Sequence, residues 1–186
     1  FEFPQKEFKV RDHELLFNDV PLMDIIKEYG TPLKLTYLPR ISENIRSTQA
    51  RFNSALEKFK YNGKYTYCYC TKSSHFSFVM EEALKNQDVH METSSAFDIP
   101  IVRALYAKGK LTKDSYILCN GFKMPLYTQY ISELLNDGFK NCVPILDEMG
   151  EFEEYEKNVV NSYRVGIRVA ADEEPKFEFY TSRLGI

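Results

Sequence analysis

The sequence predicts an α/β fold in which a parallel sheet supplies about five strands of a (β/α)8 barrel. The first observation is that strand-like and helical patterns alternate along the chain, which is typical of parallel sheets with right-handed crossovers. The second is an even spacing of 24, 27, 26 and 22 residues between strands that begin near Lys64, Asp88, Ser115, Asn141 and Tyr163. The third is a lysine at the end of the first strand, at the edge where such barrels do their chemistry.

The length limits how much of a barrel this chain can form. A complete (β/α)8 barrel takes about 250 residues, whereas this chain has 186. We therefore expect an incomplete barrel with two open sheet edges. Unpaired backbone groups at those edges would favour self-association.

The composition is that of an ordinary globular protein and excludes several kinds of partner. The apolar fraction is 44% and the net charge is −3, so we expect no basic surface of the density that nucleic acid requires. The apolar runs are too short to cross a membrane, and the first residues do not resemble a signal peptide. The four cysteines lack CxxC spacing and the histidines lack ligand spacing, which favours reduced thiols, a cytoplasmic location and no metal site.

Taken in order, the chain begins with a leader and an extended segment in residues 1–38. This part includes a helix around Leu22–Tyr29 that stops at Gly30. Residues 39–186 form the N-terminal part of the barrel, and Pro39 marks a helix start because proline is tolerated there. Apolar residues at helical spacing predict the remaining helices, which cover Ile41–Phe59, His75–Asn86, Ala96–Lys108, Pro125–Asp137 and Glu148–Val159.

The first barrel strand is expected within Lys64–His75, where it brings Lys72 to the carboxyl rim. Side chains alternate across a strand, so Lys72 shares a face with Thr66, Cys68 and Cys70. That face is small and polarisable, while the opposite face is aromatic and suited to packing under helices. The alternative interpretation of Lys72 is a solvated residue at a strand end.

Two more charged side chains are expected at the same rim. Alternation places Glu92 on the inner face of the second strand and Arg168 on the inner face of the fifth. A lysine, a glutamate and an arginine that converge at a barrel rim would suit an anionic or carbonyl ligand. Taken singly, Glu92 and Arg168 could instead form a structural ion pair.

Other polar residues are interpreted as structural. Cys68 and Cys70 are expected to fill the barrel, because a buried thiol packs as a small hydrophobe. Asn120-Gly121 is interpreted as turn chemistry and nothing more. The acidic residues of the last helix are interpreted as a solvated face, and these are Glu148, Glu151, Glu153 and Glu154.

Five motifs, in the right order and at the right spacing, resemble pyridoxal-phosphate-dependent decarboxylases of the alanine-racemase fold type, the ornithine, diaminopimelate and arginine decarboxylase family. Tyr69–Lys72 resembles the strand that carries the cofactor lysine, and Met91–Asp98 resembles the next strand and helix start. Ile117–Lys123 is similar to the form of the third motif found in biosynthetic arginine decarboxylases. The fifth strand and the loop after it are matched by Val165–Val169 and Ser182–Ile186.

The resemblance implies that this chain is the N-terminal portion of a basic amino-acid decarboxylase with a TIM barrel, and that residues 1–38 belong to a β domain of the complete enzyme. Arginine would be the substrate, giving agmatine and carbon dioxide in polyamine biosynthesis, and the complete enzyme would be a homodimer or higher homo-oligomer. Lys72 would form a Schiff base with pyridoxal 5'-phosphate, with Glu92 near the lysine and Arg168 near the phenolic oxygen of the cofactor. Asp98 is a further candidate that could instead belong only to the first turn of a helix.

The sequence departs from the family at one position and leaves alternatives open. Many relatives have an asparagine two residues after the lysine, where this chain has Ser74. In the family, the residues that grip the phosphate, stack on the ring and face the pyridine nitrogen lie further along, so we expect this portion alone to be inactive. Diaminopimelate or ornithine decarboxylase is one alternative, and a non-catalytic pyridoxal-phosphate-binding or regulatory homologue is another.

Overall fold

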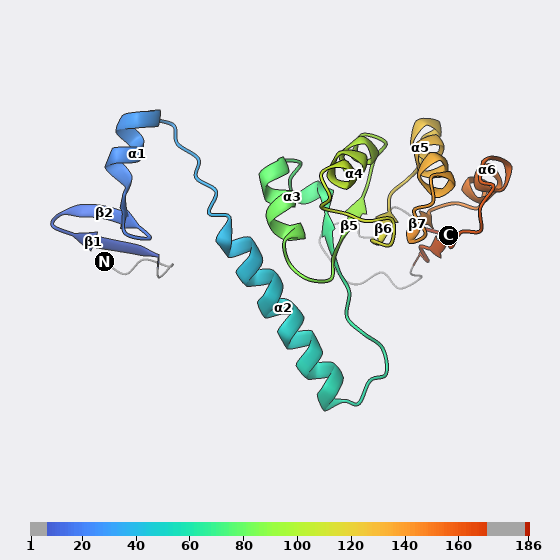
Figure 1. Ribbon diagram of the computed structural model, residues 1–186, viewed down its shortest axis with the longest axis horizontal. Coiled ribbons are helices and arrows are strands. Elements are labelled where there is room, and N and C mark those ends of the chain that lie inside the picture. The colour runs from blue at the N-terminus through green and yellow to red at the C-terminus, as the bar shows by residue number, and fades with distance from the viewer. Residues whose placement is uncertain (1–6, 171–184) are drawn as a thin grey trace. The chain divides into compact units, whose positions relative to one another are not determined.

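The computed structural model describes residues 7–170 and 185–186 (Figure 1). The chain divides into two compact units, Phe1–Tyr37 and Leu38–Ile186. No helix in the described ranges is both long and apolar enough to cross a membrane.

The first unit is a small antiparallel sheet followed by a helix. Strand β1 (Phe8–Arg11) pairs with β2 (Glu14–Phe17), β2 pairs with β3 (Val20–Pro21), and α1 (Leu22–Tyr29) follows directly. The sequence predicts this helix but not the three short strands. Both strand connections are two-residue turns in which each residue has positive φ, a geometry that matches the twist of the flanking strands; the turn residues are Asp12, His13, Asn18 and Asp19.

The second unit begins with α2 (Pro39–Lys58) and continues as a five-stranded parallel sheet. The strands lie side by side in chain order: β4 (Tyr67–Cys70), β5 (Val89–Thr93), β6 (Ile117–Cys119), β7 (Cys142–Leu146) and β8 (Gly166–Ile167). A helix follows each of the first four strands: α3 (Ser77–Leu84), α4 (Asp98–Ala107), α5 (Pro125–Asn136) and α6 (Gly150–Asn158). The predicted α/β fold and its order of elements are confirmed.

One face of this sheet packs under the helices α3 to α6, which Figure 1 shows along one side of the strands. Buried and part-buried residues alternate along β5 and β7, as expected for strands with one covered face. The covered face includes Met91, Ile117 and Cys142, each with no exposed surface. On the other face, Cys70 and Glu92 are register partners and are only part-buried. This less covered face is the one expected to line the barrel interior.

The first and last strands end earlier than the sequence predicts. Strand β4 stops at Cys70, and Lys72 lies in the following turn of 3-10 helix, η1 (Thr71–Ser73). Strand β8 covers two residues, and Arg168 comes directly after it, although its backbone N–H still donates to the Leu146 carbonyl at 3.0 Å. Both charged residues therefore lie just beyond the carboxyl ends of their strands and not within them.

Candidate active site

The three site residues predicted from the sequence lie at the same edge of the sheet. Lys72 follows β4, Glu92 is the next-to-last residue of β5, and Arg168 follows β8. Lys72 and Glu92 come from neighbouring strands, whereas β8 is at the opposite end of the strand order. Within residues 7–170 and 185–186, no hydrogen bond or ion pair joins any two of these three side chains.

Lys72 presents a free amine. Its side chain is exposed, and in the described part of the chain it makes no hydrogen bond and no ion pair. What the structure provides is an accessible amine on a short, well-anchored turn.

Glu92 is held by a residue from the next loop. Its Oε1 accepts a hydrogen bond from Nδ2 of Asn120 at 3.1 Å, and Sγ of Cys70 lies 3.8 Å from the same oxygen. Asn120 therefore does more than the turn chemistry expected of it, because it orients a site carboxylate. The following Gly121 has φ of 84°, and a Cβ there would lie 3.3 Å from the Ser94 carbonyl, so the close loop approach favours glycine.

Arg168 faces a buried carboxylate other than Glu92. Nε of Arg168 lies 3.9 Å from Oδ1 of Asp147, which is the first residue after β7. The Asp147 side chain is 1% exposed, and neither of its oxygens has a hydrogen-bond partner among the described residues. Because an unpaired buried carboxylate is costly, the neighbouring guanidinium is the group that compensates its charge. The suggested pairing of Glu92 with Arg168 is not formed.

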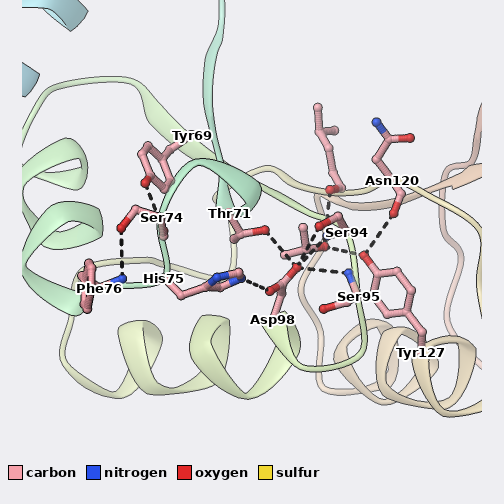
Figure 2. A network of polar contacts seen from close by, with 12 residues as sticks. Tyr69, Thr71, Ser74, His75, Phe76, Ser94, Ser95, Asp98, Asn120 and Tyr127 are labelled. Atoms are coloured by element: carbon pink, nitrogen blue, oxygen red, sulfur yellow. Dashed lines mark hydrogen bonds and ion pairs between the residues drawn. The ribbon is translucent and has the colours of Figure 1, made fainter. Parts of the chain in front are cut away.

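A second buried carboxylate, Asp98, joins the loops that follow β4 and β5 (Figure 2). It is the first residue of α4 and has no exposed surface. Its Oδ2 accepts hydrogen bonds from the Thr71 hydroxyl at 2.9 Å and from the Ser94 and Ser95 backbone N–H groups at 2.7 and 3.1 Å. Its Oδ1 lies 2.9 Å from Nε2 of His75. The sequence suggests Asp98 only as a candidate, and nothing in the local pattern reveals Thr71 and His75 as its partners.

These contacts set the charge state of Asp98. Burial by itself would raise the pKa of this carboxyl, but hydrogen bonds from the Ser94 backbone, Thr71 and His75 outweigh it and hold the pKa below its ordinary value. The carboxylate is therefore the form that the fold stabilises. A depressed pKa in the folded state stabilises the protein above the ordinary aspartate pKa, and this contribution is lost as the pH falls through the folded value.

We expect Asp98→Asn to destabilise the complete protein by about 1–3 kcal/mol at neutral pH, because an amide cannot accept all of these hydrogen bonds. The gap between wild type and variant should shrink as the pH falls below about 4, where the wild-type carboxylate becomes protonated. Urea unfolding at a series of pH values measures the gap. Asp114→Asn is the control, since that carboxylate is 74% exposed. A gap that stays constant down to pH 3 would contradict the ionic role of Asp98.

Burial sets the protonation state of one cysteine and one histidine on the less covered face. Burial, reinforced by the Glu92 carboxylate, raises the pKa of the Cys68 thiol to about 11. Burial also lowers the pKa of His90, whose Nδ1 accepts the Tyr116 backbone N–H at 3.2 Å. The Cys68 thiol is therefore protonated near pH 7, and His90 is neutral there.

One acidic residue predicted to be solvated is buried instead. Glu151, in α6, is 4% exposed, and its Oε2 lies 3.1 Å from Nζ of Lys123. The same lysine amine donates to the carbonyls of Gly121 and Ile145. The interpretation of Glu151 as part of a solvated face is therefore wrong, because a buried lysine from the loop after β6 needs a counter-charge. The neighbouring Glu148, Glu153 and Glu154 are exposed.

The fifth motif falls partly outside the described residues, since positions 182–184 are not among them. Its last two residues lie beside Arg168. The Ile186 backbone N–H donates to the Arg168 carbonyl at 2.8 Å, and the Ala170 N–H donates to the Ile186 carbonyl at 2.9 Å. Gly185 has φ of 123°, and a Cβ there would lie 2.8 Å from the Ala170 nitrogen. Only glycine fits this approach without a shift of the backbone.

Comparison with known proteins supports the resemblance seen in the motifs. The chain is 28% identical over 158 residues to a protein described as biosynthetic arginine decarboxylase from Shewanella piezotolerans, a match that covers 78% of this chain. It spans 24% of that relative's length. No family model matches the chain.

The fold is also that of a solved structure. The crystal structure of the biosynthetic arginine decarboxylase SpeA from Campylobacter jejuni matches with a TM-score of 0.69 at 19% identity. The match covers 90% of this chain and 30% of that one. At this identity the match establishes the fold, and the predicted incomplete barrel is consistent with the larger size of the solved chain.

Proposed function

We propose that the complete protein containing this chain is a pyridoxal-phosphate-dependent decarboxylase that converts arginine to agmatine and carbon dioxide. The observation that carries this proposal is the free amine of Lys72 at the carboxyl edge of a parallel sheet, next to the strand that holds Glu92. The sequence similarity to a biosynthetic arginine decarboxylase supports the choice of substrate. A cytoplasmic role in polyamine biosynthesis and a homodimeric complete enzyme belong to the same proposal.

The chemistry of the site residues fits pyridoxal phosphate. The accessible and unpaired amine of Lys72 can condense with an aldehyde, which is how lysine holds this cofactor. The Arg168 side chain is 37% exposed beside the buried Asp147, so it remains accessible to a phenolate oxygen. Glu92, fixed by Asn120, supplies a carboxylate at the same edge. We propose no phosphate-binding residue among the described residues.

Lys72, Glu92 and Arg168 would each have a different role in the reaction. When bound, pyridoxal phosphate supplies the electron sink that accepts the electron pair of the breaking bond between Cα and the carboxylate. Carbon dioxide leaves, and a proton takes its place on Cα to give agmatine. Lys72 would hold the cofactor in the resting state and regain its proton when substrate displaces it. Glu92 would hold or move a proton at Nζ of Lys72, and Arg168 would orient the ring oxygen.

The test is an assay of the complete protein with carboxyl-labelled amino acids in the presence of pyridoxal phosphate. We expect release of labelled carbon dioxide from arginine, with kcat/KM at least about tenfold above that for ornithine or diaminopimelate. Preference for one of the other two would replace the substrate while keeping the reaction. Cofactor uptake without carbon dioxide release from any of them would favour a non-catalytic binding protein, and absence of uptake would favour a regulatory homologue.

A further inference from the structure

Among the described residues, no hydrogen bond or ion pair orients the Lys72 amine. The described residues can therefore fix the position of this amine only through the backbone that carries it. That backbone is the η1 turn, a single 3-10 turn of three residues between β4 and α3. A turn this short has little regular hydrogen bonding to hold it, so its side chains must provide the anchor.

The anchor is the Asp98 carboxylate. Thr71, which directly precedes Lys72, has no exposed surface and donates its hydroxyl to Asp98 at 2.9 Å. His75, three residues after Lys72, lies 2.9 Å from the other carboxylate oxygen. Figure 2 shows both side chains pointing to Asp98 from either side of the turn. The lysine is thus bracketed by two residues that share one partner.

The same carboxylate also fixes the segment that follows Glu92. The backbone N–H groups of Ser94 and Ser95 both donate to Oδ2 of Asp98, and the Ser94 hydroxyl lies 3.3 Å from it. These residues follow the last strand residue, Thr93, by one and two positions. One buried carboxylate therefore holds the Lys72 loop and the Glu92 loop against each other.

We propose that Asp98 is a positioning residue for Lys72, acting through Thr71 and His75 to fix the direction from which the amine meets a carbonyl ligand. This inference rests on the proposed function, because pyridoxal phosphate is the carbonyl compound that it invokes. Among the described residues, Asp98 makes no hydrogen bond or ion pair with the lysine amine. A purely structural Asp98 would change the stability of the fold but not the reactivity of Lys72 in folded protein.

The experiment measures the rate at which Lys72 captures pyridoxal phosphate in the complete protein. The lysine amine condenses with the aldehyde with loss of water, and borohydride reduces the resulting C=N bond to a stable secondary amine. Peptide mapping at a series of times then gives the labelling rate at Lys72. Labelling at Lys157, an exposed lysine paired with Glu154, is the internal reference. All variants are compared well below their own unfolding temperatures.

Four variants separate positioning from folding. Asp98→Asn and Thr71→Val are expected to slow the capture at Lys72 by at least about tenfold, because small misplacements of a reacting group are costly. Thr71→Ser keeps the hydroxyl and should retain nearly the wild-type rate. Asp114→Asn makes the same chemical change at an exposed site and should have no effect. If Asp98→Asn does not fold, the difference in capture rate between Thr71→Val and Thr71→Ser still tests the positioning role.

The outcomes distinguish this inference from the proposed function. Wild-type capture rates in both Asp98→Asn and Thr71→Val would overturn the positioning role. Absence of capture at Lys72 in the wild type would overturn the proposed function instead. In that case, the positioning role is tested by hydrogen exchange of the segment 71–76 without pyridoxal phosphate. Faster exchange in Asp98→Asn than in the wild type would support the role of Asp98 in holding this segment, and unchanged exchange would overturn it.

Discussion

Replacing Lys72 by alanine in the complete protein is expected to lower arginine decarboxylation by at least about a thousandfold, equivalent to about 4 kcal/mol of lost transition-state stabilisation. The reason is that alanine has no amine with which to hold the cofactor. Stability should change by less than about 0.5 kcal/mol, because Lys72 is exposed and lacks partners among the described residues. Carbon dioxide release and urea unfolding measure the two effects.

Two further variants make this result specific to the amine. Lys72→Arg keeps a positive charge but cannot form the covalent link, so it should be as inactive as Lys72→Ala. Lys157→Ala removes an exposed lysine on α6 and should leave activity near the wild-type value. Retained activity in Lys72→Ala would end the assignment of Lys72 as the catalytic lysine, whatever the behaviour of the other two variants.

The largest loss of stability is expected from Glu151→Ala. The Lys123 and Glu151 side chains are 0% and 2% exposed, with Nζ and Oε2 at 3.1 Å. Removing one member of such a pair leaves the other as an uncompensated buried charge, which typically costs about 3–5 kcal/mol. Glu151 also accepts the backbone N–H groups of Lys123 and Asp147, at 3.3 and 3.4 Å. Urea unfolding of the complete protein measures the loss.

The matched control lies one turn further along the same helix. Glu154→Ala removes an exposed carboxylate whose ion pair with Lys157 is on the surface, so we expect a change below about 1 kcal/mol. The double variant Lys123→Met with Glu151→Leu should recover much of the lost stability, because it buries no charge. Equal effects of Glu151→Ala and Glu154→Ala would mean that Lys123 reaches water when its partner is removed.

The order of the barrel elements could be predicted because each βα unit carries its own signal. The predicted strands begin one to three residues before the observed ones, and every predicted helix of the second unit is present. The short strands of the first unit could not be predicted in the same way. They are four, four and two residues long, so too few residues alternate between apolar and polar to distinguish a strand from an irregular leader. The turns between them contain only Asp, Asn and His at positive φ.

The positions of the three candidate residues near strand ends could be predicted from the sequence, but the contacts of the neighbouring loops could not. Alternation and motif order suggest Lys72, Glu92 and Arg168, since each lies near the end of a strand. The partners of Glu151 and Asp98 depend on loops that are 28 and 27 residues away in the chain. Helical periodicity therefore made Glu151 look like its solvated neighbours. Only the packing of the β6–α5 loop against α6 shows that Lys123 is buried and that Glu151 balances its charge.

The strand order has a consequence for how the chain is made. Each strand from β5 to β8 pairs with the strand before it in the sequence, so its partner has already left the ribosome when it emerges. At about 5–20 residues per second, one βα unit appears every few seconds, and the growing sheet needs no distant segment to continue. During synthesis two edges of the described sheet are open to wrong pairing: β4 throughout, and each newest strand only until the next strand pairs with it.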